Sequence, residues 1–189
     1  MPIKFFQKAL LDNGKLQNID KIKSGDSVLS ISFKNGFAEQ SYVSVEKEHA
    51  IFPKRSWNGF KISWSGGFFF GTENQTVLLS NHEAVALKNL EAEKHELLDK
   101  NFHAHTIKKV EFGKVLCGRK TIYLKGSSTS SDDHFLNISG IWVGDAFIEE
   151  QQKSANKGRI SNAYIFPANP VIRGMRLLMM ATMGEKEEN

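Results

Sequence analysis

Two histidines separated by one residue, His103 and His105, are the most compact pair of potential metal ligands in this sequence. Side chains two apart on a β-strand point to the same face, so both imidazoles could bind one ion. A metal site needs at least a third ligand, and His95 or Glu111 could supply it only through folding. A pair of surface histidines explains the same spacing, so we predict no metal and no cofactor.

Other residues with reactive side chains lack the neighbours that their chemistry requires. Cys117 is the only cysteine, which excludes an internal disulfide and a cysteine metal cluster. Gly66 and Gly67 lack the Lys and Ser/Thr of a phosphate-binding loop, and no Ser-His-Asp order or carboxylate pair stands out. His82 and His134 fall in predicted turns, where we interpret them as hydrogen-bonded structural histidines.

Aromatic residues are concentrated between positions 57 and 70. Exposed rings there could form a platform for a glycan or a nucleobase, but packing in a core or an interface is the commoner use. The net charge is only +4, and the basic residues are scattered among acidic ones. This pattern does not favour nucleic-acid binding, which usually gathers Lys and Arg on one face.

Strands and turns, rather than helices, must position these side chains. Fourteen Phe and fifteen Gly favour a mainly β fold. One short helix is predicted over residues 90–100, because Leu90 and Leu97 are seven positions apart. We find no internal repeat. The predicted strands cover residues 27–33, 37–46, 57–70 with a break at 66–67, 76–79, 84–87, 106–115, 121–124 and 135–147.

The composition changes near residue 149, which predicts a β domain at 1–148 and a C-terminal extension at 149–189. The extension begins with a polar stretch and then becomes too apolar for a free linker. Flexible Met and Leu side chains adapt well to partner surfaces, so we interpret the extension as an interaction arm. The residues expected to contact a partner are Ile165, Phe166, Met175, Leu177, Leu178 and Met179.

Three segments, in order, resemble blocks of the Hint (hedgehog/intein) family. Residues 11–30 are similar to its opening, in which a D-G turn leads to I-x-x-I-x-x-G-D-x-V-L. Residues 77–85 are similar to its T-x-x-H block, and residues 133–145 resemble its closing block, which leads into His-Asn. The resemblance implies a Hint-like compact β fold over residues 8–147.

The resemblance also implies where the self-cleaving chemistry of the family would lie. The corresponding positions are Pro2, Leu79, His82, His134, Gly144, Asp145 and Ala146. Proline at the starting position offers no nucleophile, and alanine cannot accept an acyl group. A carboxylate also cyclises less readily than the neutral amide of the family's asparagine. The resemblance therefore predicts an inactive processing site and a protein that is not an enzyme.

The leading hypothesis is a non-enzymatic structural protein that assembles with other protein subunits. A bacteriophage virion component of the tail, baseplate or neck is the expected assembly. No secretory signal and no apolar run long enough to span a membrane is found, so a virion or cytoplasmic location is expected. The alternatives are an autoprocessing Hint-class protein working through Asp145, and a small module that binds nucleic acid or glycan.

Overall fold

The computed structural model describes residues 3–4, 6–34, 37–52, 56–115, 117–125 and 135–148. Two 3₁₀ helices, η1 (Ile19–Lys21) and η2 (Leu87–Asn89), interrupt the strands, and residues 146–148 are helical. The strands are β1 (Ile3–Lys4), β2 (Lys8–Leu10), β3 (Leu16–Asn18), β4 (Ser27–Lys34), β5 (Phe37–Ile51), β6 (Trp57–Trp64), β7 (Gly67–Gly71), β8 (Thr76–Leu78), β9 (Ala84–Ala86), β10 (Glu96–Leu98), β11 (Ala104–Thr106), β12 (Lys109–Val115), β13 (Arg119–Leu124), β14 (Phe135–Ile138) and β15 (Ile141–Gly144).

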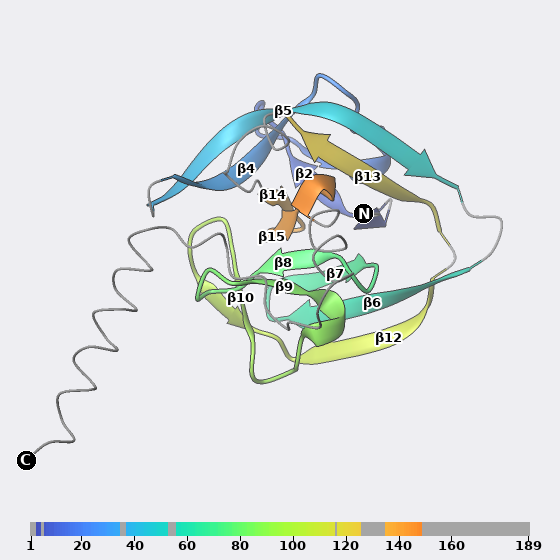
Figure 1. The fold of residues 1–189 in the computed structure, drawn as a ribbon, viewed down its shortest axis with the longest axis vertical. Helices are drawn as coiled ribbons and strands as arrows, with labels where there is room; N and C mark the ends of the chain where they lie inside the picture. Colours follow the sequence, from blue (N-terminus) through green and yellow to red (C-terminus); the bar gives the residue numbers. More distant parts are fainter. Residues whose placement is uncertain are drawn as a thin grey trace, which may run out of the picture.

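Thirteen of these strands form one curled antiparallel sheet. Its order is β12-β6-β7-β1-β13-β5-β4-β14-β15-β8-β9, with β2 paired to β14 and β3. Strands β10 and β11 pair separately. The long strand β5 and its neighbour β13 arch over one side of the molecule (Figure 1). Strands β6 and β12 lie on the opposite side, and β14 and β15 lie between the two sides. The predicted mainly β fold is confirmed.

The helix predicted over residues 90–100 is wrong. Glu93 has a φ of 62°, a left-handed backbone conformation that a right-handed helix does not contain. Glu96–Leu98 then extend as β10, in which Leu97 pairs with His105 of β11. Leu90 and Leu97 are both buried, but a turn and a strand bury them. Their spacing of seven therefore comes from two different elements.

Two parts of the chain repeat the same local structure, so the prediction of no internal repeat is wrong at the level of the backbone. Leu11 and Leu79, 68 positions apart, each close a turn: the N–H of Gly14 donates to the carbonyl of Leu11 at 3.0 Å, and that of His82 to Leu79 at 2.9 Å. Further equivalent bonds follow, from Ile19 to the carbonyl of Gln7 and from Leu87 to that of Gln75, both 2.8 Å. The repeat leaves little trace in the sequence because few of its positions keep the same residue.

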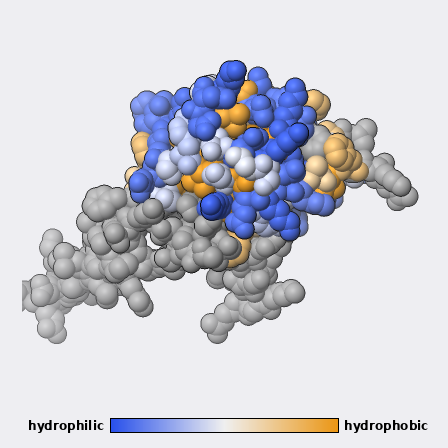
Figure 2. Space-filling model, turned by 90° about the horizontal axis from the view of Figure 1, so that it is seen from above, coloured by the Kyte–Doolittle hydropathy of each residue, from blue (hydrophilic) through white to orange (hydrophobic). Residues whose placement is uncertain are grey.

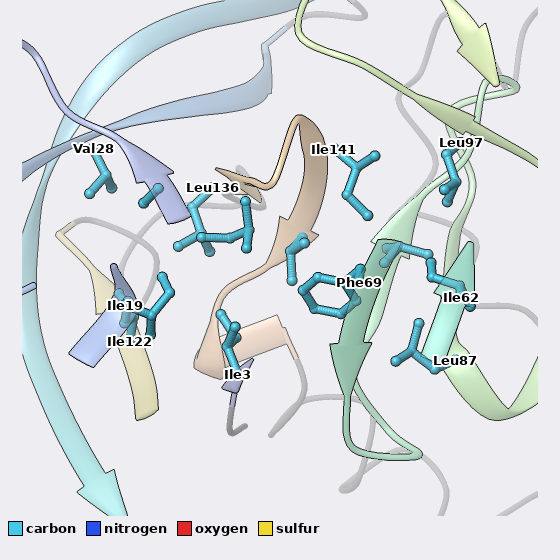
Figure 3. Packing of buried hydrophobic residues seen from close by; sticks show 14 of the residues in the cluster. Ile3, Ile19, Val28, Ile62, Phe69, Leu87, Leu97, Ile122, Leu136 and Ile141 are labelled. Atoms are coloured by element: carbon cyan, nitrogen blue, oxygen red, sulfur yellow. The ribbon is translucent and has the colours of Figure 1, made fainter. Parts of the chain in front are cut away.

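The buried core joins these two repeated parts. Ile19 and Val28 come from the first part, and Leu87 and Leu97 from the second. They lie on opposite sides of a centre that includes Ile3, Phe69 and Leu136 (Figure 3). Full burial of one such side chain contributes about 1.5–3 kcal/mol, so the core holds the two parts together. The domain boundary near residue 149 stays a prediction, because the described residues end at Ile148.

Figure 2 shows the molecule from above relative to the view of Figure 1. The coloured surface is mostly hydrophilic on this face, and hydrophobic residues appear in small groups. Across the described parts of the chain, no helix is both long and apolar enough to cross a membrane.

His82 occupies the turn position that Gly14 occupies in the first part, with φ values of 66° and 76°. A side chain at a left-handed position costs about 1 kcal/mol relative to glycine. Partial burial also lowers the pKa of His82. As the pH falls through the ordinary pKa of histidine, His82 therefore takes up a proton in the unfolded chain before it does so in the folded chain. The free energy of unfolding then decreases.

We expect His82→Gly to raise the free energy of unfolding by about 0.5–1 kcal/mol at pH 7.5. The gain should grow as the pH is lowered to about 5.5, because the variant lacks the proton uptake of the unfolded state. Urea denaturation at both pH values measures the difference. Gly14→His provides the reverse substitution and should destabilise the chain. Equal stability of all three proteins at both pH values would contradict the assigned backbone strain.

Candidate functional site

Asp145 is a fully buried carboxylate at the end of β15. Its Oδ2 accepts a hydrogen bond from the backbone N–H of Leu124 in β13 at 3.1 Å. Its Oδ1 accepts from the N–H groups of Phe147 and Ile148 at 3.0 and 3.2 Å. Asp145 thus caps the helical residues that follow it, and these donors offset the cost of burying its charge. The carboxylate is folded over the backbone on its own C-terminal side.

Tight packing around Gly144 sets this geometry. A Cβ at Gly144 would lie 3.3 Å from Cβ of Thr76 and 3.4 Å from Cγ2 of Ile148. Glycine therefore lets the start of β8 and the turn after Asp145 approach each other. Ala146 and Ile148 are both buried, which fixes the direction of the chain beyond Asp145.

Gln75 brings the β7–β8 connection against the same place. Its side chain is fully buried, and its Nε2 donates to the carbonyls of Gly144 and Thr76, each at 3.2 Å. Residues 72–75 read T-E-N-Q, which matches the spacing of the T-x-x-H block with glutamine at the histidine position. A glutamine amide can polarise a carbonyl, but it cannot transfer a proton as histidine can.

The structure does not bring His82 to Asp145. Val77 pairs with Val143 in an antiparallel register, so β8 runs away from Gly144 toward the turn that carries His82. Leu79, the predicted counterpart of the block's threonine, is instead a core residue bridged to Leu97. The segment beside the closing block is residues 72–75. Two sequence signals could have found it: Thr72 with its T-x-x-Q spacing, and Gln75 lying 68 positions from Gln7.

The remaining predicted site residues divide between buried and undescribed positions. Gly144, Asp145 and Ala146 are consecutive and buried. Pro2, His134 and the expected partner contacts Ile165, Phe166, Met175, Leu177, Leu178 and Met179 lie outside the described residues.

The aromatic residues between 57 and 70 do not share one role. Trp57, Trp64 and Phe69 are buried, in agreement with the packing interpretation. Phe68 is 54% exposed and lies edge-on to Phe70, with Lys61 over both rings. One exposed ring therefore lies beside a partly buried one, a much smaller surface than the whole cluster.

His103 and His105 meet an aspartate rather than a third histidine. Nε2 of His105 lies 3.0 Å from Oδ2 of Asp99, and Nδ1 of His103 lies 3.6 Å from the same oxygen. Among the residues that the structure describes, no three His, Cys, Asp or Glu side chains gather as a metal site. Neither His95 nor Glu111 joins the pair: His95 accepts from the N–H of Glu91, and Glu111 binds Lys61 and Lys109.

No protein-family model and no curated protein matches the chain, but solved structures do. The bacterial intein-like domain from Clostridium thermocellum aligns with a TM-score of 0.62 and 14% identity, covering 76% of this chain and 98% of that domain. A DnaB intein from Synechocystis sp. PCC 6803 aligns with a TM-score of 0.59 and 13% identity, covering 77% of this chain and 98% of the intein. The chain has a Hint-like fold. The gp41-1 intein adds a TM-score of 0.55 at 17% identity, covering 76% of this Hint-like chain and 97% of the intein.

The resemblance drawn from the three sequence blocks is thus confirmed at the level of the fold. The prediction that the Hint-like chain is not an enzyme is wrong, since the similar structures are inteins and an intein-like domain. That prediction relied on residues missing at the positions of the resembled blocks, and the segment that lies beside the closing block is residues 72–75 rather than the turn at His82. These comparisons give no support to a structural role in a virion.

Proposed function

We propose that this Hint-like chain is an autoprocessing protein that cuts its own backbone between Asp145 and Ala146. One observation carries the proposal: the buried Asp145 carboxylate is turned toward the backbone that follows it, where Oδ1 contacts the N–H groups of Phe147 and Ile148. Asp145 occupies the position of the cyclising asparagine in the resembled closing block. The fold shared with inteins supports the same chemistry.

The reaction needs no group beyond the chain and water. A side-chain oxygen of Asp145 attacks the main-chain carbonyl carbon of the same residue and closes a five-membered anhydride. The C–N bond to Ala146 breaks, and the departing nitrogen takes a proton from water to leave as an amine. A second water then opens the anhydride, which restores the Asp145 side chain and leaves a new C-terminal carboxylate.

The surrounding residues position the attacking group rather than transfer protons. The N–H of Leu124 holds Oδ2, and Gln75 holds the carbonyl of Gly144, so both sides of Asp145 are anchored. The same hydrogen bonds disperse charge from the carboxylate and weaken it as a nucleophile. Gln75 also supplies no acid for the departing amine. We therefore expect a slow reaction.

Cleavage after Asp145 would separate the β domain from residues 146–189, which include the predicted interaction arm. The arm's contacts with protein partners, and a place in a virion, stay predictions because residues 149–189 lie outside the described part of the chain. Cleavage would either release the predicted arm or leave it bound to a partner without the β domain.

We expect Asp145→Ala to abolish cleavage of the full-length chain carrying a tag at each end. Intact mass, followed during prolonged incubation, measures the products. Loss of the buried carboxylate removes the acceptor of three backbone N–H groups and should cost at least about 1–3 kcal/mol, which is within the stability of an ordinary folded domain. Asp26→Ala is the matched control, because Asp26 also caps a turn by accepting from the N–H of Lys23 at 2.8 Å. It should cleave as the wild type does, and an uncleaved wild type would refute the proposal.

A further inference from the structure

Three polar side chains away from Asp145 form a row of contacts from Ser65 through His105 to Asp99. Ser65 Oγ lies 3.4 Å from Nδ1 of His105, and Nε2 of His105 lies 3.0 Å from Oδ2 of Asp99. Serine, histidine and carboxylate in this order are the parts of a nucleophilic serine centre. The distance from Ser65 Oγ to His105 Nδ1 is long for a hydrogen bond, as it is for many such centres without substrate.

Asp99 determines which ring nitrogen of His105 carries the proton. Burial raises its pKa, but hydrogen bonds from His105 and from the N–H groups of His103 and Asn101 outweigh that effect, and its pKa is lowered. An ionised carboxylate only accepts hydrogen bonds, so Nε2 of His105 carries the proton. In neutral His105 the lone pair then sits on Nδ1, which faces Ser65.

The backbone around Asp99 holds this carboxylate firmly. Its Oδ1 accepts from the N–H of Asn101 at 2.7 Å and of His103 at 2.8 Å. The carbonyl of Asp99 accepts from the indole Nε1 of the buried Trp142 at 3.0 Å. These contacts use the opposite oxygen and the main chain, so Oδ2 faces the two histidines, His105 at 3.0 Å and the more exposed His103 at 3.6 Å.

The serine lies at the surface, where a substrate could reach it. Ser65 is exposed in the turn between β6 and β7, whereas the His105 side chain is a quarter exposed. The N–H of Lys108 donates to the carbonyl of Ser63 at 2.8 Å and ties the histidine-bearing segment to this hairpin. A Cβ on Gly66 would lie 2.7 Å from Nε1 of Trp64, so an N–H donor lies beside the serine turn.

We propose that Ser65, His105 and Asp99 form a nucleophilic centre that accepts an acyl group from a small activated ester. Ser65 Oγ attacks the ester carbonyl carbon while His105 Nδ1 takes the Oγ proton. The ester C–O bond breaks, and the alcohol leaves with the proton from His105. Water then hydrolyses the acyl-serine by the same route. Exposed Phe68, cross-strand from Ser63, offers apolar surface on the same hairpin.

The test uses the full-length chain with p-nitrophenyl acetate, with acetylation located by peptide mass mapping. Ser65 should be acetylated in the wild type, and Ser65→Ala should lose that acetylated peptide. His105→Ala should slow acetylation of Ser65 by at least about 10²-fold, the usual contribution of a general base. Ser80→Ala, which removes an exposed hydroxyl that donates to Glu96, is the control and should react as the wild type does.

Asp99→Asn tests the positioning role without removing the turn. Asparagine keeps an oxygen for the N–H groups of Asn101 and His103, but its amide would donate to Nε2 and move the proton of His105 to Nδ1. Acetylation of Ser65 should then fall by about 10²-fold or more while the circular dichroism spectrum is unchanged. Absence of acetyl-Ser65 in the wild type, or unchanged rates in His105→Ala or Asp99→Asn, would overturn the proposal.

Discussion

Asp145→Asn is expected to cleave at least about tenfold faster than the wild type, which corresponds to about 1.4 kcal/mol or more in the activation free energy. The asparagine side chain attacks the same carbonyl through its amide nitrogen and forms a stable five-membered imide. The wild-type carboxylate must instead form a strained anhydride that readily reverts. The variant therefore has the better forward reaction in the same position.

The geometry of the site favours this outcome because the substitution keeps most contacts. Asparagine retains one carbonyl oxygen that can accept from Phe147 and Ile148, as Oδ1 of Asp145 does. The amide nitrogen then takes the place of Oδ2, where it meets the N–H of Leu124 instead of accepting from it. Losing that bond frees the nitrogen for attack at a modest cost in stability. Time courses of intact mass for both proteins measure the ratio, and a slower variant would contradict anhydride chemistry at Asp145.

Lys120→Met is expected to lower the free energy of unfolding by about 2–4 kcal/mol. Lys120 is 3% exposed, and its Nζ lies 3.1 Å from Oε2 of Glu48. The same ammonium donates to the carbonyls of Asp20, at 3.2 Å, and of Ile22. Methionine keeps the apolar stem of the lysine but leaves these three acceptors without their common donor. The partial exposure of Glu48 keeps the effect below that of a fully buried pair.

Urea denaturation measures this loss, with Lys47→Met as a control. Lys47 lies on β5 like Glu48, but it is exposed and its ammonium stands over the ring of Tyr123 at 5.6 Å. Its replacement should change stability by no more than about 0.5 kcal/mol. A similar effect of the two substitutions would show that the buried ammonium does not organise the end of η1.

Local patterns predicted most strands because residues typical of turns mark where the strands end. Alternation over residues 27–33 and the signal at 34–36 predicted the β4–β5 hairpin, and the glycines at 66 and 67 marked the β6–β7 turn. The helix over residues 90–100 failed because apolar spacing alone cannot tell a helical face from a turn followed by a strand. The left-handed Glu93 carries no residue signal of the kind that glycine gives.

For the candidate site, the closing block singled out Asp145, which lies directly after β15, and the role of this residue in cleavage stays a proposal. The sequence pattern pointed to His82 because the second block requires a histidine, whereas Gln75 is the residue that contacts Gly144 in the structure. The centre at Ser65 could not have been predicted from order in the chain. Ser65 lies in the β6–β7 turn, whereas Asp99 and His105 belong to the β10–β11 hairpin, and only the folded structure brings the two hairpins together.

The two proposed centres are chemically independent, which keeps their tests separate. Asp145 acts on its own backbone inside the protein, whereas Ser65 faces solvent and acts on an external ester. Loss of acetylation would leave the cleavage proposal intact, and an uncleaved chain would leave the serine proposal intact. A fold of the intein type can carry both, because the second centre is built on the hairpin β6–β7 and the pair β10–β11, away from the end of β15.

The central claim is that the chain cuts itself after Asp145, and the intact mass of the purified, doubly tagged wild type tests it most directly. Prolonged incubation should yield two fragments, one ending at Asp145 and one beginning at Ala146, and Asp145→Ala should yield none. A single unchanged mass, or fragments at another bond that persist in Asp145→Ala, would contradict the claim.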